Sequence, residues 1–326
     1  MIEGIKTLLI DERDLPMALA FFNIIVTTLP AAAAVFYLQS HVFGLLYVVT
    51  NLITYQERFI LGLHYSSHRA IFKYSALNLI PPYLLSPFFG IPSGIYYLHH
   101  CVMHHVENNV FPYDVSSTEP FQRDNFGHLI FYWLRFLIAI WFELPYYALR
   151  RQRYGLAFHC VSCIGFFMVT TSALYKMSPV GTMWVFWIYT FVTSFLLMLG
   201  NWSQHIFVSP RNPNSNYLLA YNVINVSSNQ RCFNDGYHVE HHLHSRKHWS
   251  ELPTSFMRSL DKYAKEGGLV FEGIDNMAVG YLTFSGQLDK LAEHYVQLGP
   301  VEWTKEEIVA ELKSRLVPIH RKPKTS

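Results

Sequence analysis

Long runs of apolar residues, broken only by short polar turns, dominate the first two thirds of the chain. A helix needs about 20 such residues to cross the roughly 30 Å hydrocarbon core of a bilayer. Four runs have this length, and the turns within the first pair and within the last pair are very short, which predicts two helical hairpins. The predicted spans are residues 17–38, 43–63, 156–175 and 181–199.

Two further apolar stretches do not fit a simple crossing. Residues 74–98 contain four prolines, which predicts broken or re-entrant helices. Residues 128–149 contain Arg135, Glu143 and Pro145 among many aromatic side chains. That pattern suits a helix lying on the bilayer surface at least as well as a span.

From about residue 250 the pattern changes to that of a soluble domain. Residues 286–298, which Gly299-Pro300 ends, and residues 304–316 are helix candidates. The second begins with the capping-box pattern Thr304-x-x-Glu307 and places its apolar residues on one stripe. The predicted fold is therefore an all-α membrane protein with four transmembrane helices in two hairpins, broken or interfacial helices, and a cytosolic helical cap. The predicted domains are a membrane-embedded domain at 1–249 and a cap with its tail at 250–326.

Composition agrees with a membrane protein, because 51% of the residues are hydrophobic and only 15% are charged. The 25 lysines and arginines nearly balance the 23 aspartates and glutamates, so no strongly basic field indicates a nucleic-acid partner. Four scattered cysteines are too few for a disulfide framework. Several charges precede the first apolar run without a cleavage pattern, so we expect no cleavable signal peptide.

Positive charge falls on one side of the predicted topology. If residues 128–149 do not cross, the basic residues after the second span and the arginines at 150–153 share a side with both termini, whereas the opposite loops contain only Lys176. The positive-inside rule then predicts that both termini are cytosolic. A topology with six spans ranks second, because it would put the arginine cluster opposite the last group of histidines.

Histidine is the unusual residue type, with 17 copies. Nine of them form groups at or beyond the ends of predicted membrane helices, where a helical spacing of three or four residues directs side chains to one face. Imidazole is a neutral ligand for iron, copper, nickel or zinc, and ionisable groups at membrane depth indicate a functional site. The candidate metal ligands are His64, His68, His100, His104, His105, His205, His238, His241 and His242.

Nine imidazoles exceed what one zinc ion needs, since zinc takes four ligands, or three in a catalytic site. Two metal ions would use the whole set, which fits a di-iron centre. The carboxylate-bridged alternative needs Glu-x-x-His pairs, and this sequence contains none. His99 and His244 border the groups and are weaker candidates. Possible partners that orient the ligands are Asn201, Asp235, Glu240 and Glu107, together with Asn108 and Asp114.

The groups resemble the three histidine boxes of the membrane fatty acid desaturase and hydroxylase superfamily of non-haem di-iron enzymes. The matching boxes are His64 to His68, His100 to His105 and His238 to His242, and the resemblance covers residues 17 to about 250. It implies that the nine histidines ligate two iron ions, that dioxygen is the co-substrate, and that an external carrier supplies two electrons for attack on an unactivated C–H bond.

Two motifs keep the reaction open. The second box has one residue more than the His-x-x-His-His of many desaturases, and Asn201-x-x-x-His205 also resembles the alkane hydroxylase branch, where such a motif supplies a ligand. In contrast, the "GYHVEHH" of residues 236–242 is close to the third box of acyl-lipid desaturases and carotenoid ketolases. We expect desaturation of a fatty acyl or acyl-like chain, with a hydroxylase, ketolase or epoxidase of a lipid, hydrocarbon or polyketide chain as the alternative.

The sequence contains no cytochrome b5 motif, nucleotide-binding glycine loop or iron–sulfur cysteine pattern. We therefore expect a separate electron donor such as cytochrome b5 with its reductase. Lys322-Pro323-Lys324 resembles the dilysine retrieval signal of endoplasmic reticulum membrane proteins, with a basic tail that attracts anionic lipid as the alternative. A histidine-rich membrane metal transporter is a rival from another class, and it predicts ionisable groups at the midplane of the spans.

Overall fold

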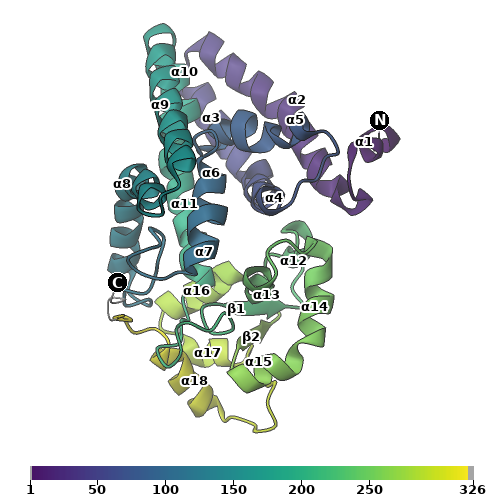
Figure 1. The fold of residues 1–326 in the computed structure, drawn as a ribbon, viewed down its shortest axis with the longest axis vertical. Coiled ribbons are helices and arrows are strands. Elements are labelled where there is room, and N and C mark those ends of the chain that lie inside the picture. Colours follow the sequence, from purple (N-terminus) through teal and green to yellow (C-terminus); the bar gives the residue numbers. More distant parts are fainter. Residues whose placement is uncertain (1, 322–326) are drawn as a thin grey trace. The chain divides into compact units, whose positions relative to one another are not determined.

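The computed structural model of the protein describes residues 2–321, and most of them are helical (Figure 1). The chain divides into two compact units. Unit 1 comprises Met1–Met103 and Ile140–Leu196, and unit 2 comprises His104–Ala139 and Leu197–Ser326. The predicted functional boundary at residues 249 and 250 is a different division and stays a prediction.

Four helices are long and apolar enough to cross a membrane, which confirms the predicted fold class of a helical membrane protein. Three of them contain the predicted spans 17–38, 156–175 and 181–199. The fourth contains the stretch that was expected to lie on the bilayer surface, and its length and composition equally permit a crossing. The four helices are Glu12–Leu38, Phe126–Arg150, Tyr154–Met177 and Pro179–Gln204.

The predicted span at 43–63 is not among these four. It lies in α3 (His41–Asn51), the π-helix η2 (Leu52–Gln56) and α4 (Glu57–His68), which follow one another without a break. Polar and charged residues in η2 and α4 lower the mean hydropathy of this continuous helix. Its length of 28 residues, counted from His41 to His68, corresponds to about 42 Å of α-helix, which is enough to cross a bilayer.

Two polar side chains of this helix are buried within unit 1 and bonded to neighbouring helices. Thr28 Oγ1 donates to Asn51 Oδ1 at 2.7 Å, and Tyr189 OH donates to Gln56 Oε1 at 2.8 Å. Asn51 and Gln56 are only 4% and 6% exposed. Polar side chains that are paired between helices stabilise helix association within a membrane, so the two buried polar residues are compatible with a membrane-spanning helix.

The proline-rich stretch at 74–98 forms short broken helices, as predicted, including the π-helix η3 (Ile80–Leu85) and the 3₁₀-helix η4 (Ser86–Phe89). Gly90 ends η4 with φ of 75°, and a Cβ atom there would meet the carbonyl oxygen of Tyr189 at 2.6 Å. The remaining elements of unit 1 are α1 (Ile2–Leu8), η1 (Glu12–Asp14), α2 (Leu15–Leu38), α5 (Ser75–Asn78), α6 (Ile95–Tyr97), α9 (Tyr154–Met177), α10 (Pro179–Thr182) and η6 (Met183–Ile188). Three elements contain a unit boundary: η5 (Leu98–His104), α8 (Phe126–Arg150) and α11 (Tyr189–Gln204).

Unit 2 contains a small sheet that the sequence did not predict. Strands β1 (Tyr221–Ile224) and β2 (Leu269–Glu272) pair in parallel, with Tyr221 opposite Leu269. The other elements of this unit are α7 (His105–Glu107), α12 (Ser228–Arg231), α13 (His238–Leu243), η7 (Trp249–Glu251), α14 (Leu252–Arg258), α15 (Leu260–Glu266), α16 (Asn276–Phe284), α17 (Leu288–Ala292) and α18 (Lys305–Ser314).

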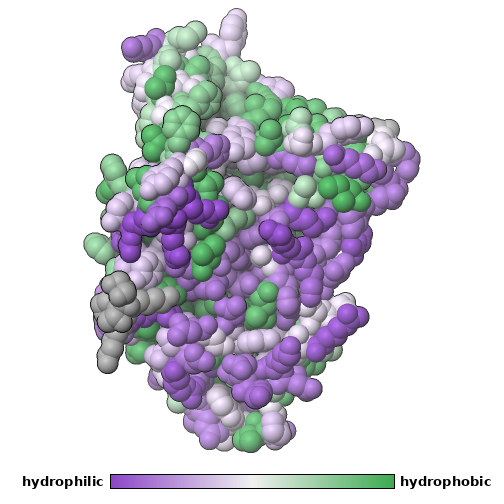
Figure 2. Space-filling model, viewed as in Figure 1, coloured by the Kyte–Doolittle hydropathy of each residue, from purple (hydrophilic) through white to green (hydrophobic). Residues whose placement is uncertain are grey.

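One of the two helices predicted near the C-terminus is confirmed, and the other is shorter than predicted. Thr304 and Glu307 form the expected capping box of α18. The helix predicted at 286–298 ends at Ala292, because the following backbone bonds to β2, where the amide of Val296 donates to the carbonyl of Val270 at 2.9 Å. On the face drawn in Figure 2, apolar residues gather over α9 of unit 1, whereas polar residues cover much of α15 and α18 of unit 2.

Candidate metal centre

Unit 1 brings three of the predicted ligands together. His64 and His68 project from one side of α4, and His100 comes from η5. The ring centroid of His100 lies 4.3 Å from that of His64 and 4.9 Å from that of His68. Each of the three rings offers a nitrogen within 4.8 Å of a nitrogen on the other two.

The second box lies on a π-helical segment, which explains its additional residue. η5 ends at His104 and α7 begins at His105, so a turn with bonds from residue i to i+5 separates His100 from the His104–His105 pair. Such π-turns are rare and often occur at functional sites. The extra spacer residue is therefore accommodated in the backbone, and all three side chains of the box keep a common helical segment.

Unit 2 brings together a buried trio of His104, His205 and His242, whose ligating nitrogens lie within 4.8 Å of one another. His104 begins the unit, His205 directly follows α11, and His242 lies on α13. All three side chains are at least 92% buried, with exposed fractions of 2%, 0% and 8%. Buried imidazoles that converge in this way are suited to a metal ion.

Each ring of the trio faces an oxygen acceptor with its Nδ1 atom. His104 Nδ1 donates to Asp114 Oδ2 at 2.7 Å, His205 Nδ1 to the carbonyl of Leu219 at 2.9 Å, and His242 Nδ1 to Asn108 Oδ1 at 3.4 Å. A neutral imidazole that donates from Nδ1 carries its lone pair on Nε2. Metal-ligating histidines almost always make such a bond through the nitrogen that does not bind the metal.

Burial keeps two rings of the trio neutral. It lowers the pKa of His205 to about 3, with a further contribution from the charge of His104, and it lowers the pKa of His242 well below its ordinary value. Metal binding requires an unprotonated imidazole nitrogen. His242 Nε2 is also buried without a hydrogen-bond partner among the described residues, so the structure leaves this lone pair available to a ligand.

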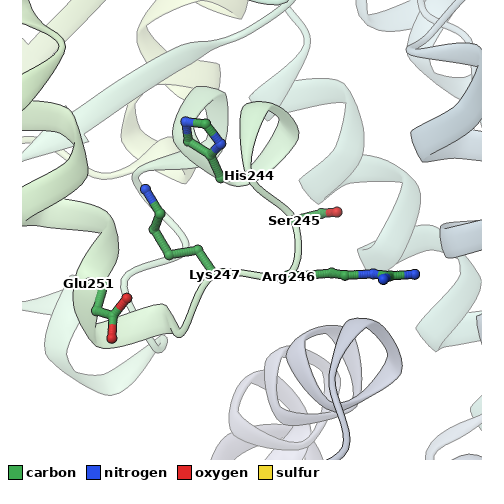
Figure 3. A pocket seen from close by; sticks show the side chains of 5 residues that line it. All are labelled: His244, Ser245, Arg246, Lys247 and Glu251. Carbon is green, nitrogen blue, oxygen red and sulfur yellow. The ribbon is translucent and has the colours of Figure 1, made fainter.

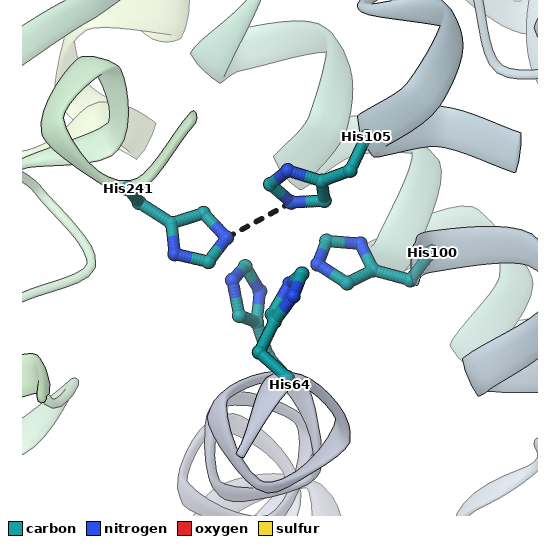
Figure 4. Close-up of side chains that lie close together, drawn as sticks. His64, His100, His105 and His241 are labelled. Carbon is teal, nitrogen blue, oxygen red and sulfur yellow. Dashed lines mark hydrogen bonds between the residues drawn. The ribbon is translucent and has the colours of Figure 1, made fainter. Parts of the chain in front are cut away.

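The other three histidines of unit 2 lie beside this trio. His238 Nε2 is 3.2 Å from His205 Nε2, and His241 Nε2 is 2.9 Å from His105 Nε2. Figure 4 shows the second contact as a dashed line. Two nitrogens about 2.1 Å from one ion and at right angles to each other lie about 3.0 Å apart. Both spacings therefore fit pairs of ligands on a shared ion.

α13 holds the third box in place through β1 and its neighbours. The amide of Val239 donates to Asn222 Oδ1 at 2.9 Å, and the amide of Val223 donates to the carbonyl of Gly236 at 2.8 Å. A Cβ atom at Gly236 would meet Asn229 Oδ1 at 2.2 Å. The glycine before the box thus permits β1 to pack against the turn that leads into α13.

The predicted partners have different positions. Asp114 and Asn108 contact ligands of the trio directly. Asn201 Nδ2 donates to Tyr132 OH at 2.8 Å and to the carbonyl of Ser116 at 3.0 Å, so it supports the segment that carries Asp114. The other three predicted partners are buried. Glu240 accepts a hydrogen bond from Tyr263 OH, and Asp235 accepts one from Gln204 Nε2, so both bond to residues outside the trio. Glu107 lies two residues after His105 on α7.

No sequence signal identified the carbonyl of Leu219 as a partner of His205. A backbone carbonyl has no side-chain signature, and Leu219 lies 14 positions from His205.

Of the two bordering histidines, His244 is exposed at the end of α13 and lines a surface pocket with Ser245, Arg246, Lys247 and Glu251 (Figure 3).

Residues 39–273, more than half of the chain, match the family described as fatty acid desaturase. The chain belongs to the fatty acid desaturase family. This confirms the resemblance drawn from the histidine boxes. A comparison with curated proteins and a comparison with solved structures found no match. As a member of the fatty acid desaturase family, the protein is a lipid-modifying oxidoreductase of the desaturase and hydroxylase superfamily, a family that is typically metal-dependent.

Proposed function

We propose that this protein is a membrane desaturase that introduces a carbon–carbon double bond into a fatty acyl or acyl-like chain, with nine histidines holding two iron ions. The observation that carries the proposal is the buried trio of unit 2, in which all three Nδ1 atoms face oxygen acceptors and one ligating nitrogen of each ring lies within 4.8 Å of those of the other two. The ligand set would be His64, His68, His100, His104, His105, His205, His238, His241 and His242.

When bound, the two irons would activate dioxygen for attack on an unactivated C–H bond. In the balanced reaction, two neighbouring CH₂ groups each lose one hydrogen, and dioxygen with two electrons and two protons from the donor gives two water molecules. The protein's own residues orient the site. Asp114 and the carbonyl of Leu219 would keep the protons of His104 and His205 on Nδ1, so that both Nε2 atoms remain ligands.

The product distinguishes this reaction from its nearest alternative. Hydroxylation would use the same electrons but leave one oxygen atom in the product, and the π-helical second box with Asn201-x-x-x-His205 keeps that reaction as the second candidate. We expect mass spectrometry of lipids from a host expressing the protein to show acyl chains that have lost two hydrogens. Chains that have instead gained an oxygen atom would overturn desaturation in favour of hydroxylation.

The arrangement of unit 2 supports the predicted membrane topology. His104 and His205 belong to one compact unit and one histidine trio, so they share a side of the membrane. Between them the chain passes through α8, α9 and the continuous helix from α10 to α11. Three crossings would put the two histidines on opposite sides. We infer that two of these helices cross, which also argues against the six-span alternative.

α8 is the helix that best fits the bilayer surface. It has the lowest mean hydropathy of the four candidate spans, and Arg135 on it donates to the carbonyl of Val115 at 2.7 Å. One of its faces presents a stripe of exposed apolar residues at spacings of three and four, as expected for a helix embedded in a leaflet. The stripe consists of Phe131, Leu134, Ile138, Phe142, Tyr146 and Leu149.

This topology predicts that Asn225, in the sequon Asn225-Val-Ser, carries no glycan, because it would face the cytosol together with the third box. Asn225 is exposed and therefore reports on its side of the membrane. The other sequon, at Asn201, lies inside α11 with an only partly exposed side chain and is uninformative. Peptide mass spectrometry of protein from a eukaryotic host, with a secreted glycoprotein as positive control, tests this. A glycan on Asn225 would contradict the topology.

A separate protein on the cytosolic side, such as cytochrome b5 with its reductase, would supply the electrons. The loop after α13 offers a basic contact for an acidic carrier, because Arg246 and Lys247 outnumber Glu251 in the pocket of Figure 3. We also propose an endoplasmic reticulum location with both termini cytosolic, although Lys322 and Lys324 of the dilysine-like sequence lie outside the described residues.

A further inference from the structure

The segment between α7 and α8 fixes the orientation of metal-site histidines without helical or strand structure of its own. Residues 108–123 consist entirely of turns and irregular backbone. They nevertheless supply Asn108 to His242 and Asp114 to His104, and Thr118 Oγ1 donates to the carbonyl of His205 at 2.9 Å. Since no regular backbone ladder holds this segment, its position depends on contacts with the rest of unit 2.

Arg123 provides one set of these contacts. Its guanidinium is fully buried and donates to the carbonyls of Ile206 at 2.9 Å, Arg315 at 2.7 Å and Val317 at 2.8 Å. It also reaches carbonyls within its own segment, among them that of Thr118 at 3.3 Å. Burying a charged group is costly unless its hydrogen bonds are satisfied. Arg123 therefore stabilises the positions of the backbone segments that supply these carbonyls.

The C-terminal strap, which we define as residues 315–321, provides the second set. Its backbone runs along the 108–123 segment, with the amide of Arg123 donating to the carbonyl of Leu316 at 2.9 Å and the amide of Ile319 to that of Glu119 at 2.7 Å. The strap ends with a charged clamp, in which Arg321 Nε donates to Glu119 Oε2 at 2.8 Å and Arg321 Nη2 to Glu119 Oε1 at 2.5 Å.

Glu119 connects Arg321 to the backbone of the 108–123 segment. It is only 1% exposed, and its Oε2 atom also accepts from the amide of Phe111 at 3.1 Å. An arginine–carboxylate pair with two parallel bonds fixes geometry as well as charge. The carboxylate of Glu119 therefore binds both Arg321 of the strap and the backbone amide of Phe111, which lies three residues before Asp114.

We propose that the C-terminal strap is a positioning element of the metal site, with Arg321 as a positioning residue that acts on His104 and His205 through Glu119 and the 108–123 segment. This inference rests on the proposed function, because it assumes that the histidines bind metal. The strap bonds to residues 119 and 123 of this segment. It holds in place the segment whose side chains set the direction of the imidazole rings.

The test compares Arg321→Met with Arg211→Met in the full-length, iron-loaded protein. Arg211 forms an ion pair with Glu311 of α18, so its replacement also removes an arginine–glutamate pair near the C-terminus but leaves the clamp on Glu119 intact. The readout is the rate at which a ferrous chelator removes iron from folded protein, checked by circular dichroism and size-exclusion chromatography. A purely structural role of Arg321 would lower thermal stability without changing iron release from the folded fraction.

We expect Arg321→Met to lose iron about tenfold faster than the unmodified protein, in the range typical of residues that orient metal ligands, and Arg211→Met to match the unmodified protein. Equal rates for the two variants would overturn the inference. If Arg321→Met does not fold, Arg321→Lys, which keeps the charge without the planar fork, is judged by the same criterion. Unmodified protein that binds no iron would instead contradict the proposed function.

Discussion

The variant His242→Ala is expected to lose iron and to retain less than about 1% of the desaturase turnover. Residues that only orient a ligand cost about 10–100-fold in metal affinity or activity when replaced, and removing the ligand itself should cost more. His242 is the member of the trio whose Nε2 atom is buried without a hydrogen-bond partner among residues 2–321. Iron content by elemental mass spectrometry and product formation by lipid analysis measure the two losses.

His244→Ala is the matched control for this experiment. His244 lies two residues further along the chain, at the exposed end of α13. Its replacement should leave iron content and turnover unchanged. The ligand assignment fails if His242→Ala keeps both its iron and its activity, or if the two alanine variants lose them to the same extent.

Asp114→Ala is expected to weaken iron binding by about 10–100-fold while the nine histidines remain. Asp114 is fully buried and accepts the proton of His104 Nδ1, and its other oxygen accepts from the amide and hydroxyl of Ser116. Without the carboxylate, His104 Nδ1 loses its short hydrogen bond, so the direction and the tautomer of the ring are less firmly set. Asp114→Asn, which keeps one oxygen acceptor, should bind iron with intermediate affinity. Iron titration of the apoprotein measures the change.

Asp124→Asn serves as the comparison for Asp114. Asp124 lies ten positions further along the chain, is exposed and accepts a hydrogen bond from Gln122 Nε2, so its replacement should not change iron affinity. Wild-type affinity in Asp114→Ala would show that His104 does not depend on this carboxylate. Loss of affinity in both aspartate variants would point to a general loss of fold.

The histidine groups could be predicted from the sequence because helical spacing determines which side chains share a face. His64 and His68 illustrate this, as both lie on α4 and their ring centroids are 5.7 Å apart. The π-helical backbone of the second box could not be predicted. The extra residue before His104 is as compatible with an α-helix in which one side chain is displaced as it is with a π-helical turn. Only the tertiary structure distinguishes these possibilities.

The partners of the histidines were harder to predict because they come from irregular backbone. Asn201 was a natural candidate by its motif, yet its side chain bonds to Tyr132 and to the Ser116 carbonyl. Asp114 lies ten residues after His104 with no periodic relation to it. Its role depends on the path of residues 108–123, which is set by long-range contacts such as those of Arg123 and Arg321.

Hydropathy located most of the membrane helices, but it could not decide whether residues 41–68 and α8 cross the bilayer. Residues 41–68 contain Asn51 and Gln56. Their side chains are buried and hydrogen-bonded within unit 1, which lowers the free-energy cost of placing them in a membrane. α8 is apolar enough to span, and its proposed place on the bilayer surface rests on the trio of His104, His205 and His242, which favours two crossings among the three helices between His104 and His205. In both cases the deciding information is tertiary, because hydropathy counts residues without regard to their partners.

Metal analysis of the purified full-length protein, by elemental mass spectrometry against a quantified protein concentration, tests the central claim most directly. The proposed centre predicts two iron ions per chain, lost together in His242→Ala and retained in His244→Ala. A single zinc ion per chain, or iron that is retained after His242 is replaced, would contradict it.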